Sequence, residues 1–109
     1  MDPPKTATGV DESQLIDRVL TGDMTAARTL YDAHLGAVHR LAMRMTRDPA
    51  LAQEATQDTF VRAFRALRGF RRDAPFKAWL HRIAVSSILN VLRARNRWNA
   101  RRAEIDEAD

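Results

Sequence analysis

The stretch of sequence that decides the fold is residues 70–97, FRRDAPFKAWLHRIAVSSILNVLRARNR. A short basic turn leads to Pro75, which suits the first position of a helix because the N–H that proline lacks would have no partner there. Beyond the turn, apolar or small side chains recur every three or four residues, which is the period of one helix face. These side chains are Phe76, Trp79, Leu80, Ile83, Ala84, Ser87, Ile88, Val91 and Leu92, with Trp98 in the same register. The pattern predicts a helix from Pro75 to about residue 101, with Ala74 as its N-cap.

Three segments before this stretch have the same helical period. Residues 12–21 form a short apolar stripe, and residues 24–46 carry the longest unbroken one. Residues 49–68 follow after Asp48 and Pro49, a pair that stops one helix and starts the next. The chain has only four glycines and few β-branched residues, which favours helix throughout. The predicted fold is all-α, a compact bundle of about four helices.

The chain of 109 residues is long enough for one small domain with a single core. Residues 1–10 contain two prolines and no apolar period, which indicates a disordered N-terminal tail. The helical domain is predicted over residues 11–102, with Asp11 as the N-cap of its first helix. The acidic residues 103–109 are predicted to be a frayed tail or the start of a linker. No apolar run reaches the roughly 18 residues of a membrane span, and residues 1–10 lack the apolar part of a secretory signal.

The positive charge of the protein is concentrated in its C-terminal half. The net charge is +4, and residues 61–102 carry 12 basic side chains and one acid, Asp73, whereas the segments on either side are net acidic. Sixteen of the 18 basic residues are arginine, whose guanidinium binds phosphate in a fork and stacks on flat rings. This asymmetry indicates either a polyanionic partner or a solvated helix face.

Signatures of enzymes and of metal sites are missing from the sequence. There is no glycine-rich phosphate loop, no Gly-x-Ser-x-Gly motif and no cysteine. His34, His39 and His81 lack the spacing of metal ligands, so each is expected at the surface or at its boundary. We therefore expect a protein without enzymatic activity, cofactor or metal.

The basic segment has aromatic residues between its cations. Arg71, Arg72, Lys77 and Arg82 surround Phe70, Phe76 and Trp79. Such an arrangement is typical of single-stranded nucleic-acid binding, with cations on the phosphates and rings against the bases. The alternative for Phe76 and Trp79 is packing in the core. The arginines of residues 93–102 extend the charge, and periodicity does not separate duplex binding from a solvated face there.

The predicted helix over residues 49–68 has a second, polar face beside its apolar one. Glu54, Asp58, Val61 and Arg65 recur at spacings of four, three and four, and Gln57 flanks them. No third metal ligand lies nearby in the sequence. This face is therefore predicted to be a protein-docking surface or a solvated one.

The order of these motifs resembles the region 2 domain of bacterial extracytoplasmic-function sigma factors. The resemblance covers about residues 14–97 and is carried most specifically by Gln57-Asp58-Thr59-Phe60 with Ala63, and by Phe70-Arg71, Phe76, Trp79-Leu80 and Arg82-Ile83-Ala84. It implies a compact helical domain that binds core RNA polymerase and recognises the −10 promoter element in transcription initiation. It also implies a cytoplasmic protein with no membrane partner and with an anti-sigma factor as a further partner.

The resemblance also assigns residues to the two main partners. Docking on the clamp helices of the largest polymerase subunit would involve Glu54, Gln57, Asp58, Val61 and Arg62. Contacts with promoter DNA, including capture of a flipped-out base of the non-template strand, would involve Phe70, Arg71, Arg72, Asp73, Phe76, Lys77, Trp79, Arg82, Ser86 and Arg93. The alternative function is a helical protein-binding adaptor with incidental DNA contact.

Three sites depart from the family pattern. Ser86 stands where the family tends to have asparagine, and a hydroxyl has a shorter reach and fewer donors than an amide. Ala74 and Pro75 replace a serine-rich turn, and Gln53 replaces a common acid. The base preference and the shape of the turn are therefore not carried over from the family. The family's second domain, which binds the −35 element, has no counterpart in this sequence, as expected for an isolated or truncated domain.

Overall fold

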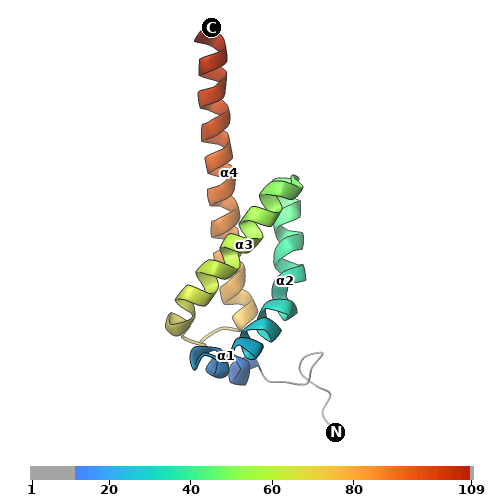
Figure 1. The fold of residues 1–109 in the computed structure, drawn as a ribbon, viewed down its shortest axis with the longest axis vertical. Helices are drawn as coiled ribbons and strands as arrows, with labels where there is room; N and C mark the ends of the chain where they lie inside the picture. The colour runs from blue at the N-terminus through green and yellow to red at the C-terminus, as the bar shows by residue number, and fades with distance from the viewer. Residues whose placement is uncertain (1–11, 109) are drawn as a thin grey trace.

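The computed structural model describes residues 12–108, which form four α-helices and one short 3₁₀ turn, with no strand among them (Figure 1). The helices are α1 (Glu12–Leu20), α2 (Met24–Thr46), α3 (Pro49–Ala66) and α4 (Phe76–Ala108), and the turn η1 (Leu67–Gly69) follows α3. The predicted all-α bundle of four helices is confirmed. The predicted tail at residues 1–10 and the predicted cap at Asp11 lie outside the described residues.

Two aspartates determine where α2 and α3 begin. Asp23 accepts a hydrogen bond from the Ala26 N–H, and Asp48 accepts hydrogen bonds from the N–H groups of Ala50 and Leu51. Each bond satisfies a backbone donor that has no partner within its own helix. Because these caps are local signals, the predicted bounds of α2 agree with the structure at both ends.

The pKa of Asp48 is lowered, because the Leu51 N–H and the Arg95 guanidinium both donate hydrogen bonds to its carboxylate. A carboxyl group whose folded-state pKa lies below its ordinary value of 3.8 takes up a proton more readily in the unfolded chain. Its stabilising effect is therefore complete above that ordinary value. The effect is lost as the pH falls through the lowered pKa of the folded state.

We expect an Asp48→Asn variant to lose less stability in acid than the wild-type protein. Asparagine caps a helix about as well as aspartate, but it cannot ionise and forms no ion pair with Arg95. The melting temperature of the variant should lie below that of the wild type at neutral pH, and the difference should shrink at about pH 3. A difference of the same size at both pH values would contradict this role of the carboxylate.

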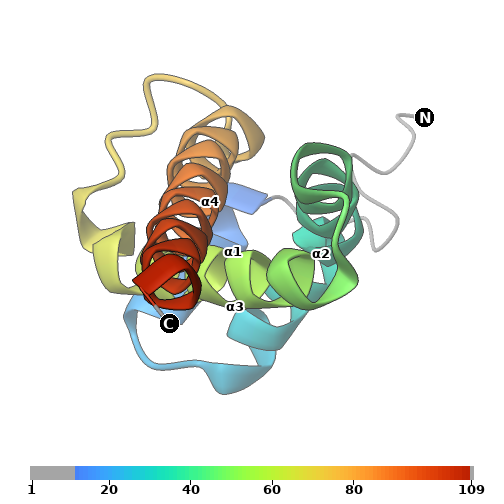
Figure 2. The same ribbon diagram turned by 90° about the horizontal axis from the view of Figure 1, so that it is seen from above.

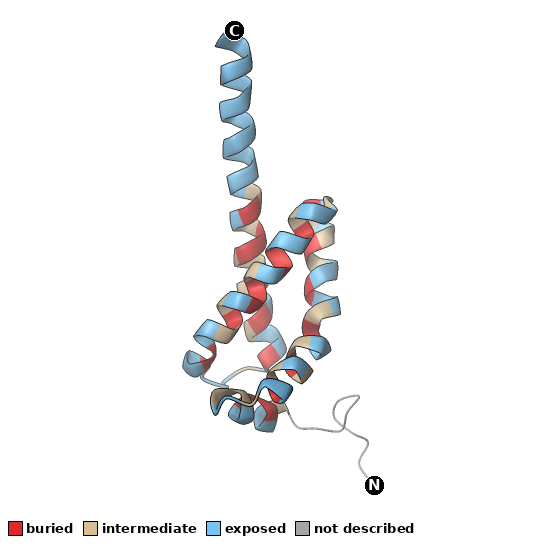
Figure 3. Ribbon diagram, in the orientation of Figure 1, coloured by how far each residue is buried: buried red, intermediate tan, exposed pale blue. Residues whose placement is uncertain are grey.

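The core of the bundle lies where α3 packs against both α2 and α4, and α1 covers one end (Figures 1 and 2). Near α1 the core is built from large side chains, among them Leu30, Phe60 and Leu80. A second cluster joins the same three helices farther along and consists of Ala42, Ala52, Ala55, Ile88 and Val91. Its small alanines allow the helices to lie close together, and the buried residues line the facing sides of the helices (Figure 3).

Helix α4 continues beyond the bundle as a free-standing rod (Figures 1 and 3). Residues 93–108 are all exposed, and Trp98, which keeps the register of the buried stripe, is 57% exposed because no helix faces it. The predicted end of this helix near residue 101 was wrong. The helix runs to Ala108 because its last residues include no glycine or proline and are mostly strong helix formers.

Two local predictions were also wrong. Pro75 precedes α4 instead of opening it, and its carbonyl accepts hydrogen bonds from the N–H groups of Ala78 and Trp79. His34 was expected at the surface or at its boundary but is buried. Its Nε2 lies 2.7 Å from a carboxylate oxygen of Glu12, so α1 supplies the polar partner that a buried imidazole requires.

Candidate nucleic-acid and protein interfaces

The connection between η1 and α4, residues 70–75, is held at both ends by buried aromatic rings. Phe70 is 9% exposed and Phe76 is 7% exposed, and their ring centroids lie 5.8 Å apart. The ring of Trp79 lies 4.9 Å from Phe70 and 5.6 Å from Phe76, and this side chain is only partly buried. The three rings form one cluster at the edge of the core. For Phe76, burial supports core packing over a ring face open to a base.

Charged side chains lie exposed between these rings and along the first turns of α4. Arg71 and Asp73 are exposed on the connection, and Lys77 and Arg82 are exposed on the helix. Lys77 and Arg82 also line an open hollow at the start of α4. With three cations and one acid, this surface is net positive, which suits a phosphate backbone.

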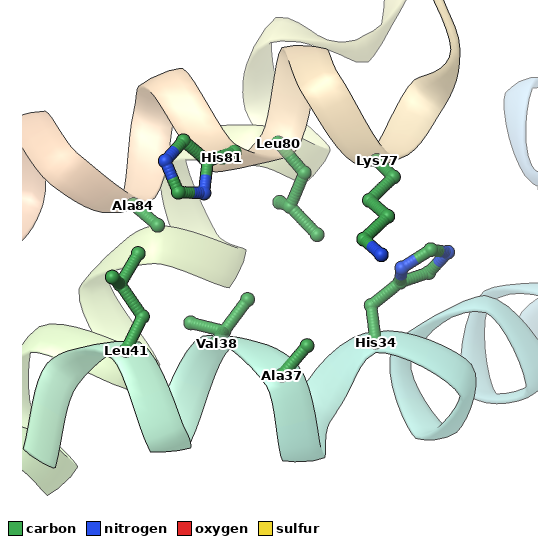
Figure 4. Close-up of a pocket in the computed structure, with 8 residues that line it drawn as sticks. All are labelled: His34, Ala37, Val38, Leu41, Lys77, Leu80, His81 and Ala84. Carbon is green, nitrogen blue, oxygen red and sulfur yellow. The ribbon is translucent and has the colours of Figure 1, made fainter. Parts of the chain in front are cut away.

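A small cavity of about 50 Å³ lies between α2 and the start of α4 (Figure 4). Val38, Leu41 and Leu80 give it apolar walls, while Lys77 and His34 lie at one end. Its volume corresponds to a few water molecules at most. The cavity is too small to enclose a nucleobase and does not add to the candidate interface.

The guanidinium of Arg72 is engaged by α1. Its Nη2 lies 2.6 Å from the Asp17 carboxylate, and its Nη1 lies 2.8 Å from the Ser13 hydroxyl. The φ angle of Arg72 is +62°, in the left-handed region that residues other than glycine rarely adopt. Arg72 was predicted to contact DNA together with Arg71, but the contacts of its guanidinium in the structure are with the scaffold.

Arg62 connects two surfaces that the sequence predicted separately. In the predicted docking set on α3, its Nη1 lies 3.8 Å from the Asp58 carboxylate. The same guanidinium donates hydrogen bonds to the hydroxyls of Ser87 (2.9 Å) and Ser86 (3.3 Å) on α4. Because Ser87 is fully buried, Arg62 satisfies a hydroxyl that burial has removed from water. Ser86, the predicted base-contacting residue, is therefore hydrogen-bonded to a residue of the predicted docking set.

The predicted docking residues of α3 share one side of the helix, named here the docking face: Glu54, Gln57 and Val61 are exposed, and Asp58 and Arg62 are half-buried. On the other side of the helix, Thr59, Phe60 and Ala63 are buried in the core. The Asp58 side chain is 44% exposed and Val61 is 47% exposed. The docking face therefore offers a partner an apolar contact beside carboxylates, and both kinds of contact occur in protein interfaces.

Some arginines at the far end of α4 are engaged by the protein itself. Arg93 donates a hydrogen bond to the side-chain oxygen of Asn90 (3.2 Å), and Arg95 donates one to Asp48 (2.9 Å). These are exposed contacts of small energetic effect. Arg93 was predicted to contact DNA, and it remains exposed in the structure, about two turns of α4 beyond Ser86.

Three polar residues that hold predicted interface residues in place were not predicted from the sequence: Ser13, Asp17 and Ser87. They lie 59, 55 and 25 residues from the arginines that they contact. No motif or spacing links such distant positions. The one available signal was Ser87, a hydroxyl inside an otherwise apolar stripe, because a buried hydroxyl needs a partner.

Metal-binding and membrane-spanning features are not found within residues 12–108. No group of three histidine, aspartate or glutamate side chains there could hold a metal ion. No helix in this part of the chain is both long enough and apolar enough to cross a bilayer.

Comparison with known proteins gives consistent matches over most of the chain. Residues 30–98 match the family model described as Sigma-70 region 2. The chain is 38% identical over 90 residues to the RNA polymerase sigma-H factor of Pseudomonas aeruginosa, which covers 83% of this chain and 47% of that protein. It is 37% identical over 82 residues to the ECF RNA polymerase sigma factor SigM of Mycobacterium tuberculosis (75% of this chain, 42% of that protein). It is 36% identical over 83 residues to the ECF RNA polymerase sigma-E factor of Salmonella typhimurium (76% and 43%). The matched region spans less than half the length of each of these relatives.

Proposed function

The chain belongs to the sigma-70 region 2 family, as a region 2 domain of the extracytoplasmic-function sigma factors. We propose that it acts in transcription initiation. It binds core RNA polymerase and recognises the −10 promoter element by capturing bases of the non-template strand. The observation that carries the proposal is the grouping of Arg71, Lys77 and Arg82, all exposed, around a connection whose two ends are fixed by buried rings.

In this proposal the DNA-binding residues divide into two kinds by their burial. Phe70 and Phe76 are buried, so they anchor the connection to the core and do not stack on a base. The exposed cations contact phosphates. Trp79 is partly exposed, and Ser86 is half-buried with its hydroxyl hydrogen-bonded to Arg62, so these two residues flank the place where a base is captured.

The docking face carries the proposed contact with polymerase. Glu54 and Val61 are exposed and Asp58 is half-buried on one side of α3, where they would meet the clamp helices of the largest subunit. The docking face and the DNA-binding connection belong to different elements of the same rigid bundle. Polymerase and DNA can therefore bind at the same time, and Arg62 of the docking face is hydrogen-bonded to Ser86 and Ser87 of α4.

An energetic comparison indicates what the domain can do without polymerase. Opening duplex DNA requires about 1.4 kcal/mol for each base-pair step, whereas stacking one captured base returns about 1–3 kcal/mol. One or two captured bases cannot offset the opening of a whole transcription bubble. The domain therefore traps a −10 strand that has already opened, and polymerase supplies the remaining free energy.

We expect the domain to bind single-stranded −10 DNA weakly and the matching duplex at least about tenfold more weakly, because each opened step opposes binding by about a factor of ten. Fluorescence anisotropy with labelled oligonucleotides of one sequence measures both affinities, and both should fall steeply with added salt. Equal affinity for the single strand and the duplex would contradict the proposed capture of bases. It would favour the alternative of a protein-binding adaptor with incidental DNA contact.

A further inference from the structure

We propose that α1 is a positioning element for the DNA-binding connection and that Arg72 is a positioning residue, through which α1 holds residues 70–75 in shape. This inference rests on the proposed function, because it concerns what holds the same connection in the conformation that binds a base. The sequence suggested a different role for Arg72, which was predicted to contact DNA.

The first observation is the set of bonds from Arg72 to α1. One guanidinium nitrogen bonds the Asp17 carboxylate at 2.6 Å, and the other bonds the Ser13 hydroxyl at 2.8 Å and its carbonyl at 3.4 Å. The side chain thus contacts two successive turns of one face of α1. A planar guanidinium held at both ends has a fixed direction, which a single exposed ion pair does not give.

The second observation is that packing alone does not hold the connection. An open hollow of about 310 Å³ separates it from α1, and its walls include Ser13, Ile16, Phe70, Arg72 and Ala74. The buried rings fix the two ends of the connection, but its middle residues, 71–73, are all exposed. The bonds from Arg72 to α1 bridge this hollow and replace the missing packing.

The third observation is the backbone conformation at Arg72. Its φ angle of +62° is unfavourable for a residue with a Cβ, and such a conformation persists only where surrounding contacts determine it. The side-chain bonds of Arg72 are contacts of this kind. A neighbouring bond helps to fix the approach to the connection, since Arg68 of η1 donates a hydrogen bond to the Leu20 carbonyl at the end of α1.

The test uses a substitution for which this inference and simple electrostatics predict opposite changes in the affinity for DNA. Asp17→Asn removes one negative charge, so a purely electrostatic effect would strengthen DNA binding. If α1 positions the connection, the variant should instead bind single-stranded −10 DNA about threefold to fivefold more weakly, the upper part of the range that one exposed ion pair can contribute. Asp32→Asn is the matched control, because Asp32 also pairs with an exposed arginine but does so within α2. The control should bind as tightly as the wild type or slightly more tightly.

Limited proteolysis with trypsin gives a second measurement that does not depend on DNA. Cleavage after Arg71 and Arg72 should be faster in Asp17→Asn than in the wild type and unchanged in Asp32→Asn, at equal melting temperatures. Unchanged cleavage would overturn the inference, and so would faster cleavage without weaker DNA binding. If the wild type shows no preference for single strands, the proposed function fails, while the cleavage rates still report whether α1 holds the connection.

Discussion

An Asp58→Arg substitution is expected to lower the affinity for core RNA polymerase at least about thirtyfold. Loss of one member of a buried ionic contact across an interface costs about 2–5 kcal/mol, and each 1.36 kcal/mol is a factor of ten. Asp58 is 44% exposed at the centre of the docking face, and its carboxylate has Arg62 as an ionic neighbour at 3.8 Å. Reversal of the charge would oppose a basic partner surface and place two cations one turn apart on α3.

Fluorescence titration of labelled domain with core polymerase measures this effect. The matched control is Asp32→Arg on α2, the same change at an exposed aspartate that also has an arginine one turn away. The control should bind polymerase like the wild type, and both variants should keep the melting temperature within a few degrees. Normal binding by Asp58→Arg would remove the docking face from the proposed function.

Removal of three cations at the DNA-binding connection is the second large expected effect. A variant with Arg71, Lys77 and Arg82 all changed to alanine should bind single-stranded −10 DNA at least about a hundredfold more weakly, because charged hydrogen bonds contribute about 1.5–3 kcal/mol each. The dependence of affinity on salt should also flatten. Each phosphate contact contributes about 0.7 to that slope for single strands, so the slope should decrease by about 2. Arg72 is left in place because its guanidinium contacts α1.

The control for this variant removes the same charge from the free-standing part of α4. Arg97, Arg101 and Arg102 are all exposed there, and their replacement by alanine should weaken binding far less. Polymerase binding should be normal in both variants, in contrast to Asp58→Arg. An equal loss of DNA affinity in both triple variants would show that total charge decides binding, and would contradict the assignment of the connection.

The helices could be predicted because their signals are local. Asp23 and Asp48 act on N–H groups two or three residues away, so the printed sequence contains both the donor and the acceptor of each cap. The apolar stripe of α4 likewise predicted which side chains are buried or partly buried, up to Leu92. Past that point the same register continues to Trp98, but burial also requires a facing helix, and α4 extends there beyond the rest of the bundle (Figure 1).

The candidate site was harder to predict because burial and contacts in a connection have no period. Phe70 and Arg71 are adjacent in sequence, yet one is buried and the other exposed. Arg72 and Arg71 are equally basic, and only the position of α1, 55 residues earlier at Asp17, distinguishes them. Motifs therefore indicated where the interface lies. Which of its residues are exposed, and which instead contact the rest of the protein, depended on tertiary contacts.

Helix α4 is continuous in geometry but not in stability. Its first half is held by the core. Beyond Arg95, which donates a hydrogen bond to Asp48 of the bundle, the helix extends by propagation from the packed half, which already provides the nucleus. Glu104, Asp106 and Glu107 lie near the negative end of the helix dipole, and repulsion between these like charges destabilises the last turns of α4. The free end can thus unwind and rewind without unfolding the bundle. The number of helical residues in α4 is therefore set by an equilibrium between helix and coil at its free end. A cationic partner bound near the C-terminal end would shift this equilibrium towards helix.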